Sequence, residues 1–195
     1  MVVYQTFYVL KVNEVYNVVN QSITNKTTLK YYTSIIKDKN ISSNIINIIE
    51  KQGDRQNLST NVRAQMTEWR MQYEPGFSDL NIIILNILKV ITRANFNIDI
   101  NYICSDMWGM KYISNNPAIT HDHFPATWSI SYYLKPPKNC PGLTFTEYKK
   151  EVNVKDGLLI IFPGNIKHHV ESRTFKGARY VVSANYNPNN SLAKL

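Results

Sequence analysis

The chain has 195 residues, of which 44% are hydrophobic and 18% are charged, which is typical of one globular domain with a buried core. The net charge of +8 favours acidic partners, but no run of five basic residues outlines a nucleic-acid footprint. Two cysteines, Cys104 and Cys140, exclude a disulfide framework, and no stretch reaches the roughly 18 apolar residues of a membrane span. We therefore expect a cytoplasmic protein that is not inserted in a membrane.

The first part of the chain gives few clear signals. Val2–Val12 alternates well enough to predict a strand, whereas Glu14–Tyr32 is polar and favours no element. Gly53–Tyr73 is also polar, and its aromatic and methionine residues are too irregularly spaced for a prediction. We expect those aromatic side chains to pack on the rest of the domain.

Two helices are predicted before residue 97. Ser43–Glu50 is a short helix candidate, with Ser42 or Ser43 as its N-cap. Asp79–Ala94 is the clearest helix, because isoleucine and leucine recur at i, i+3, i+4 and i+7 while polar residues take the opposite face. Ser78 is its expected N-cap. Both helices are expected to support a sheet.

From residue 98 onward the sequence changes to short apolar runs separated by turn residues. Many short strands at this spacing predict a sandwich or barrel. In the run MWGMKYI, alternation places Trp108, Met110 and Tyr112 on one face. The predicted strands, apart from the histidine segment, are Ile98–Cys104, Met107–Ile113, Leu143–Tyr148, Gly157–Phe162 and Arg179–Tyr186.

Three histidines suggest a metal centre inside this barrel. His121 and His123 are two residues apart, so on a strand their side chains would point the same way and would chelate one ion. The alternative is a surface or core pair. A third histidine, His168, follows the buried run GLLIIF and a Pro-Gly turn. Three neutral imidazoles with open positions on one side suit Fe(II).

These motifs resemble the iron(II)- and 2-oxoglutarate-dependent oxygenases, in their prolyl-hydroxylase-like and phage-type branches. The matching features are HxH, YYL, FPxxxxH, HxV and RY…Y in this order, over about Trp108–Tyr186. The resemblance implies a mainly β (α+β) fold with a double-stranded β-helix, or jelly roll. It selects His168 over His169 as the third metal ligand. His123 occupies the position at which most members have a carboxylate.

The resemblance also implies a site for the cosubstrate. Arg179 would bind the distal carboxylate of 2-oxoglutarate, since a guanidinium matches a carboxylate with two hydrogen bonds. Tyr133, the second tyrosine of YYL, would help to hold the same carboxylate, and Ser183 lies on the same predicted face as Arg179. Arg173 follows His168 too closely to match the paired arginines of nucleic-acid-demethylating members, and it is expected to be a loop residue or a substrate contact.

The implied activity is that of a dioxygenase with Fe(II), 2-oxoglutarate and O2, in which His121, His123, His168 and Arg179 are the catalytic group. It would hydroxylate a C–H bond, in the first place that of a prolyl or other protein side chain, and release succinate and CO2. One alternative is a nucleic-acid-modifying oxygenase, to which the positive charge would contribute. The others are a cupin-type metal enzyme and a silent jelly-roll binding module.

The expected organisation is one domain over 1–195. Residues 1–96 would provide a strand and support helices, residues 97–187 the double-stranded β-helix, and residues 188–195 a loose tail. If the chain is phage-encoded, as its resemblance suggests, the cytoplasm would be that of the host cell.

Overall fold

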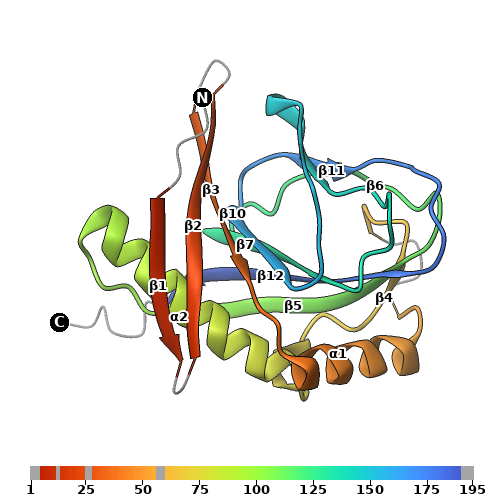
Figure 1. The fold of residues 1–195 in the computed structure, drawn as a ribbon, viewed down its shortest axis with the longest axis horizontal. Coiled ribbons are helices and arrows are strands. Elements are labelled where there is room, and N and C mark those ends of the chain that lie inside the picture. The colour runs from red at the N-terminus through yellow and green to blue at the C-terminus, as the bar shows by residue number, and fades with distance from the viewer. Residues whose placement is uncertain (1–4, 12–13, 25–27, 56–59, 190–195) are drawn as a thin grey trace.

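A computed structural model describes residues 5–11, 14–24, 28–55 and 60–189. Its backbone forms two sheets and two α-helices (Figure 1). The strands are β1 (Gln5–Lys11), β2 (Glu14–Thr24), β3 (Thr28–Ile35), β4 (Gln65–Met66), β5 (Tyr102–Tyr112), β6 (Ala118–His121), β7 (Trp128–Leu134), β8 (Leu143–Phe145), β9 (Lys150–Val152), β10 (Leu158–Pro163), β11 (His168–Val170) and β12 (Arg179–Pro188). The helices are α1 (Lys39–Gln52) and α2 (Phe77–Phe96), with 3-10 turns η1 (Met71–Tyr73) and η2 (Thr146–Tyr148).

The strands from β5 onward form the jelly roll that the sequence predicts. The larger sheet has the order β1-β2-β3-β10-β7-β12-β5-β4, and the smaller sheet has the order β6-β11-β8-β9. From β5 to β12 the chain passes repeatedly between the two sheets, so their inner faces enclose a common interior. The mainly β fold with supporting helices is therefore confirmed.

Two hydrophobic clusters lie on opposite faces of the larger sheet. The outer cluster includes the isoleucines of α1 and the apolar face of α2, which cover the sheet. The inner cluster fills the jelly roll and includes Trp108, Met110, Tyr112, Tyr133 and Phe162. Trp108, Met110 and Tyr112 thus share the interior face, as their alternation predicts.

The N-terminal strands extend the larger sheet. β3 pairs antiparallel with β10, and β2 joins β1 to β3. The strand predicted over Val2–Val12 is present as Gln5–Lys11, and its ends lie outside the described residues. The polar stretch Glu14–Tyr32, for which no element was predicted, contains β2 and the first part of β3, because sheet pairing outweighs its weak local pattern.

The helices are found as predicted, but both predicted N-caps are wrong. Asp38 is the N-cap of α1, and its carboxylate accepts hydrogen bonds from the backbone N–H of Asn40 and Ile41. Gly76 precedes the first turn of α2 with φ of 79°, which places Ser78 inside the helix.

Three predicted strand boundaries also change. The strands predicted over Ile98–Cys104 and Met107–Ile113 merge into one strand, β5, which begins only at Tyr102 and ends at Tyr112. The predicted strand Leu143–Tyr148 ends at Phe145, and η2 follows from Thr146. Of the predicted tail, Pro188 still belongs to β12 and the N–H of Asn189 donates to the carbonyl of Asn101. Residues 190–195 lie outside the described part.

Candidate metal centre

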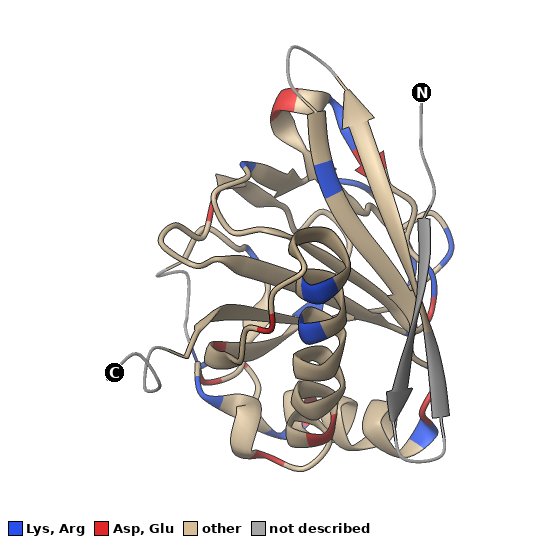
Figure 2. Ribbon diagram, turned by 90° about the vertical axis from the view of Figure 1, so that its left-hand side faces the viewer, with Lys and Arg blue, Asp and Glu red and all other residues tan. Residues whose placement is uncertain are grey.

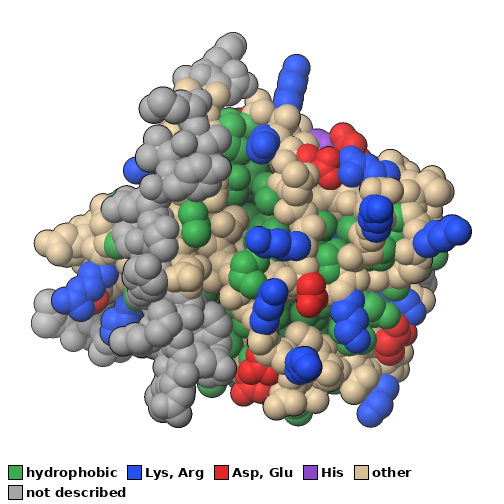
Figure 3. Space-filling model, viewed as in Figure 1, with side chains coloured by type: hydrophobic (Ala, Val, Ile, Leu, Met, Phe, Trp, Pro, Cys, Tyr) green, Lys and Arg blue, Asp and Glu red, His purple; other side chains and the backbone are tan. Residues whose placement is uncertain are grey.

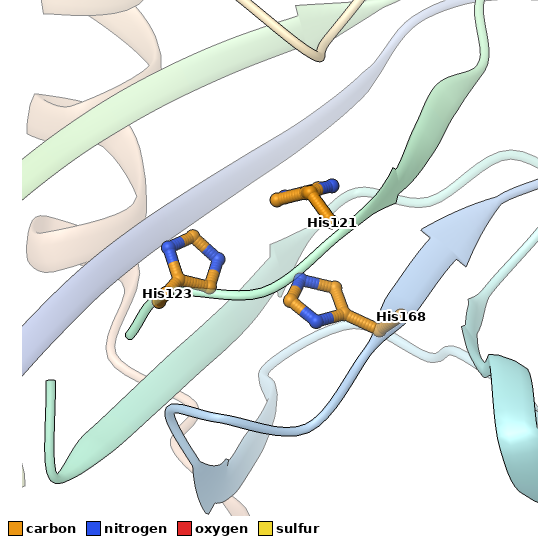
Figure 4. Close-up of side chains that lie close together, drawn as sticks. All are labelled: His121, His123 and His168. Atoms are coloured by element: carbon orange, nitrogen blue, oxygen red, sulfur yellow. The ribbon is translucent and has the colours of Figure 1, made fainter. Parts of the chain in front are cut away.

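His121, His123 and His168 lie together on the inner wall of the jelly roll. One ring nitrogen of each lies within 4.8 Å of one ring nitrogen of each of the others. The ring centroids are 4.5 Å apart for His121 and His168 and 5.1 Å apart for His123 and His168. Figure 4 shows the three rings turned toward one shared space. This arrangement can bind one metal ion.

Antiparallel pairing between β6 and β11 brings two of the histidines together. His168 is the direct cross-strand partner of His121. Val170 pairs with Ala118, so three residues of β11 span the length of four residues of β6. A β-bulge takes up the extra residue, and His121 therefore stays on the interior wall although it is three positions after Ala118. Ile119 and Thr120, between them, are exposed.

The prediction that strand alternation aligns His121 with His123 is wrong, because β6 ends at His121. His123 reaches the site from a turn. Its backbone N–H donates to the carbonyl of Gly164 at 2.7 Å, and its carbonyl accepts from Ala126 at 2.8 Å. A side chain at Gly164 would collide with the backbone of Ala126, so this close approach of the two turns requires glycine.

Backbone carbonyls orient two of the imidazoles. Nδ1 of His121 is 2.7 Å from the carbonyl oxygen of Ile119, and Nδ1 of His168 is 2.9 Å from that of Ile166. Because only a protonated Nδ1 can donate to a carbonyl, each ring keeps the lone pair of Nε2 for another partner. Metal-binding histidines are commonly held in this way.

Burial keeps two of the histidines neutral. Burial lowers the pKa of His168 to about 3, assisted by the neighbouring His121 and His123 and opposed by the Ile166 carbonyl. Burial likewise lowers the pKa of His123 to about 4, with a further contribution from His121 and an opposing one from Asp122. These imidazoles are therefore unprotonated at neutral pH, which is the state that binds a metal ion. The donor set fits Fe(II).

His169 lies outside this cluster, as predicted from its position next to His168. The Nδ1 atom of His169 is 2.8 Å from the hydroxyl oxygen of Thr146, on the other side of β11. Thr146 begins η2. The histidine cluster therefore includes His168 and excludes its neighbour.

Arg179 lies at the far end of the same pocket. Its side chain is only 1% exposed, and its guanidinium carbon lies 4.2 Å from the ring centroid of Tyr112 and 5.8 Å from that of Tyr133. One terminal nitrogen donates to the carbonyl of Pro141, whereas Nε is buried without a hydrogen-bond partner among the described residues. A buried guanidinium with an unused donor suits an anionic ligand.

A narrow pocket of about 30 Å³ lies between the histidines and Arg179. Cross-strand pairing of β5, β12 and β7 builds its floor in rows. Trp108, Ser183 and Ser131 form one row, followed by a row of Met110, Val181 and Tyr133. The predicted Tyr133 and Ser183 thus both line the pocket that contains the histidines and Arg179.

Arg173 has no place in this pocket. Its guanidinium forms a two-point ion pair with Glu151, with N–O distances of 3.0 Å and 2.8 Å, and also contacts Glu171 at 3.3 Å. Glu151 in turn accepts a hydrogen bond from the backbone N–H of Gly142. Arg173 is therefore a loop residue that ties neighbouring segments together.

A second pocket of about 330 Å³ opens beside the histidines and was not predicted from sequence. Its walls include His121, His123, Trp69, Asp106 and Asp122. Trp69 packs against Trp108 with ring centroids 4.9 Å apart. Alternation along β5 places Asp106 on the same face as Trp108, and this was the signal available in the sequence. Trp69 lies in an irregular segment that gave no such signal.

The jelly roll, with the three histidines on its inner wall, is the fold that the resemblance to 2-oxoglutarate- and iron-dependent oxygenases predicts. The comparison with solved structures confirms this resemblance in fold. The viral collagen prolyl hydroxylase of Paramecium bursaria Chlorella virus-1, solved as a complex with 2-oxoglutarate, has a TM-score of 0.60 at 15% identity. The match covers 80% of this chain and 94% of that one.

Two further solved structures agree. A prolyl-4-hydroxylase of Pseudomonas putida matches with a TM-score of 0.61 and 11% identity, over 82% of this chain and 92% of that one. A prolyl hydroxylase of Trichoplax adhaerens, in complex with a hypoxia-inducible-factor peptide fragment, has a TM-score of 0.53 and 18% identity, covering 79% and 82%. No family model and no curated protein matches the sequence. At these identities the likeness establishes the fold.

The distribution of charge gives no support to a nucleic-acid substrate. Lysine and arginine are spread over many elements (Figure 2), and on the face shown in Figure 3 they are interspersed with acidic side chains. The walls of the second pocket contain two aspartates and, among the described residues, no lysine or arginine. Separately, no helix in the described ranges has both the length and the apolar character needed to cross a bilayer.

Proposed function

We propose that the protein is an Fe(II)- and 2-oxoglutarate-dependent dioxygenase that hydroxylates a C–H bond of a protein side chain such as proline. One observation carries the proposal: the histidine cluster and the buried Arg179 lie at opposite ends of one pocket inside a jelly roll. With Fe(II) and 2-oxoglutarate bound, the centre would supply activated O2 for hydroxylation, and succinate and CO2 would be released.

Each residue of the pocket would have a separate role. His121, His123 and His168 would hold the metal. The Nδ1 atoms of His121 and His168 contact backbone carbonyls, which leaves Nε2 for the metal, and burial keeps His123 and His168 neutral. Arg179 would bind the distal carboxylate of 2-oxoglutarate. Tyr133, whose pKa is raised by burial and which therefore keeps its hydroxyl proton at neutral pH, would be a second donor.

The surrounding side chains would exclude water from the bound groups. The interior cluster is apolar apart from the few polar residues that face the pocket. Water-excluded surroundings strengthen the attraction between Arg179 and a carboxylate. A protein substrate is the preferred class because the three solved relatives are prolyl hydroxylases, one of them with a peptide bound. A reducing, cytoplasmic setting belongs to the proposal, since Cys104 and Cys140 are both free.

The test is to add Fe(II) and 2-oxoglutarate to metal-free protein under nitrogen and to record the visible spectrum. We expect the charge-transfer band of a 2-oxo acid chelated to Fe(II). Bound metal without this band would assign the histidines to other metal chemistry. Absence of both metal and band would leave a jelly-roll binding module.

Alanine variants test which residues bind the metal and which bind 2-oxoglutarate. We expect His168→Ala to abolish metal uptake, whereas His169→Ala, at the neighbouring position outside the cluster, should retain it. Arg179→Ala should bind metal and weaken 2-oxoglutarate binding more than tenfold, roughly the loss of one charged hydrogen-bonded pair. Metal uptake by His168→Ala together with its loss in His169→Ala would contradict the assignment. Circular dichroism of each variant checks that it is folded.

A further inference from the structure

The second pocket has a chemical character that differs from that of the whole chain. The chain carries a net charge of +8, but the charged side chains that line this pocket are those of Asp106 and Asp122. Apart from His121 and His123, the described part of its wall contains no side chain that can carry a positive charge. The pocket is therefore an acidic site on a basic protein.

Its position makes it the approach to the metal centre. His121 and His123 line both the inner pocket, which contains Arg179, and this outer one, and so does Trp108. A group bound in the outer pocket thus contacts the wall formed by two of the three histidines. The inner pocket is the place for 2-oxoglutarate, which leaves the outer pocket for the substrate.

The loaded three-histidine site compensates at most one of the two aspartates. A divalent ion, the dianion of 2-oxoglutarate and the guanidinium of Arg179 sum to +1, and neutral imidazoles add nothing. The carboxylate of Asp106 has no hydrogen bond or ion pair within the described part of the chain, and Asp122 accepts only the backbone N–H of Phe124 at 3.1 Å. Both are available to a cationic ligand.

Two tryptophans give the pocket features that suit a peptide. Trp69 is 36% exposed and offers an aromatic face next to the aspartates. Trp108, which lines both pockets, is 4% exposed, and its buried indole N–H has no partner among the described residues. Aromatic walls bind both proline rings and the cationic side chains of lysine and arginine.

We infer that the outer pocket recognises a lysine or arginine adjacent to the hydroxylated residue of a peptide substrate, through Asp106 and Asp122 and the face of Trp69. This inference rests on the proposed function, because it assigns the inner pocket to the cosubstrate. It adds a substrate preference that the fold alone does not imply.

The experiment compares three acetylated peptide amides, Ala-Ala-Lys-Pro-Lys-Ala-Ala and its counterparts with glutamate or alanine in place of lysine. Binding to the full chain with Fe(II) and 2-oxoglutarate is measured by titration calorimetry under nitrogen, so that no turnover occurs. We expect the lysine peptide to bind about tenfold more tightly than the glutamate peptide, with a difference that shrinks as salt is added.

Three variants test whether the preference for the lysine peptide depends on Asp106. Asp106→Asn keeps the shape of the side chain and should reduce the preference for lysine several-fold, and Asp106→Lys should reverse it. Asp99→Asn is the matched control, since Asp99 is exposed, lies outside the pocket and forms an ion pair with Arg93 at 3.8 Å. Its preference should equal that of the wild type. Equal binding of the lysine and glutamate peptides, binding of none of the three, or an unchanged preference in Asp106→Asn would overturn the inference.

The charge-transfer band, recorded on the same samples, separates this inference from the proposed function. A band without discrimination between the peptides would overturn the acidic pocket as a specificity site and leave the oxygenase proposal intact. Discrimination without a band would retain the pocket as a site for cationic peptides and reject the assignment of the inner pocket to 2-oxoglutarate.

Discussion

His123 gives the candidate centre a charge different from that of a site with two histidines and one carboxylate. Three neutral imidazoles leave the full charge of a divalent ion uncompensated, whereas a carboxylate would remove one unit of it. The ring of His123 is held between Trp108, with centroids 5.8 Å apart, and His168. Packing therefore fixes its position, and neither ring nitrogen has a hydrogen-bond partner among the described residues.

Replacing His123 with aspartate tests whether this charge matters. We expect His123→Asp to bind Fe(II) at least as tightly as the wild type, because a carboxylate adds Coulomb attraction to the ion. His123→Ala should bind Fe(II) more weakly, since one ligand is lost. Metal titrations monitored by a competing chelator measure both. Tighter binding by the alanine variant than by the aspartate variant would show that residue 123 does not ligate the metal.

Gly109, the glycine of strand β5, marks a close approach of the two helices to that strand. It lies on β5 between Trp108 and Met110, which face the pocket, and its own missing side chain faces α1 and α2. A Cβ atom at Gly109 would lie 2.5 Å from Cγ1 of Ile49 and 3.1 Å from Cζ of Phe77. The helix layer therefore rests directly on the strand that supplies Trp108.

We expect Gly109→Ala to lower the free energy of unfolding by about 2 kcal/mol, as overpacking of a core commonly does. The change is measured by urea denaturation. Ile49→Val removes one of the two contacting atoms of Ile49 and should recover part of the loss when combined with Gly109→Ala. Additive losses in the double variant would show that Ile49 is not the obstacle.

The sequence predicts those features of the site that depend on local pattern. Alternation along β7 and β12 places Tyr133, Ser183 and Arg179 on one interior face, and all three line the pocket. The elements that were missed depend on long-range pairing. Strand β2 has a polar sequence and is held by pairing to β1 over Glu14–Asn20 and to β3 over Val18–Thr24. The predicted N-caps of both helices differ from the observed ones by a few residues, because several residues near each helix start are polar or glycine and can act as a cap.

The rest of the site could not be predicted because it depends on tertiary approach. His123 enters from a turn that is fixed by a hydrogen bond to Gly164, forty-one residues later. Trp69 reaches the outer pocket by packing on Trp108, and no periodicity in its own segment indicates this. Sequence periodicity describes faces of elements, and these two residues are placed by neighbours distant in the chain.

For the whole molecule, buried neutral histidines make stability depend on pH. The pKa values of His123 and His168 are about 4 and about 3 in the folded protein, against 6.5 for an ordinary imidazole. Between pH 6.5 and these values the unfolded chain binds more protons than the folded chain. The free energy of unfolding of the metal-free protein should therefore fall as the pH is lowered from 6.5 toward 4.

Urea denaturation of the metal-free protein at pH 7.5, 6, 5 and 4.5 measures this dependence. His168→Gln has no titrating group at that position, so its stability should vary less over the same range. A metal ion that binds only the folded chain should add stability, most clearly at pH 7.5, where protons do not compete for the ligands. Identical pH profiles for the wild type and His168→Gln would contradict the buried neutral state of His168.

The bulge in β6 couples the length of a strand to the chemistry of one side chain. Without the extra residue, Ala118 and the histidine would still face inward opposite Val170 and His168. In the bulged strand, the carbonyl of Ile119 lies 2.7 Å from Nδ1 of His121. A shorter, perfectly paired β6 would keep the histidine on the wall but place a different carbonyl two positions before it, so the contact that holds the Nδ1 proton, and leaves Nε2 for an ion, would have to form anew.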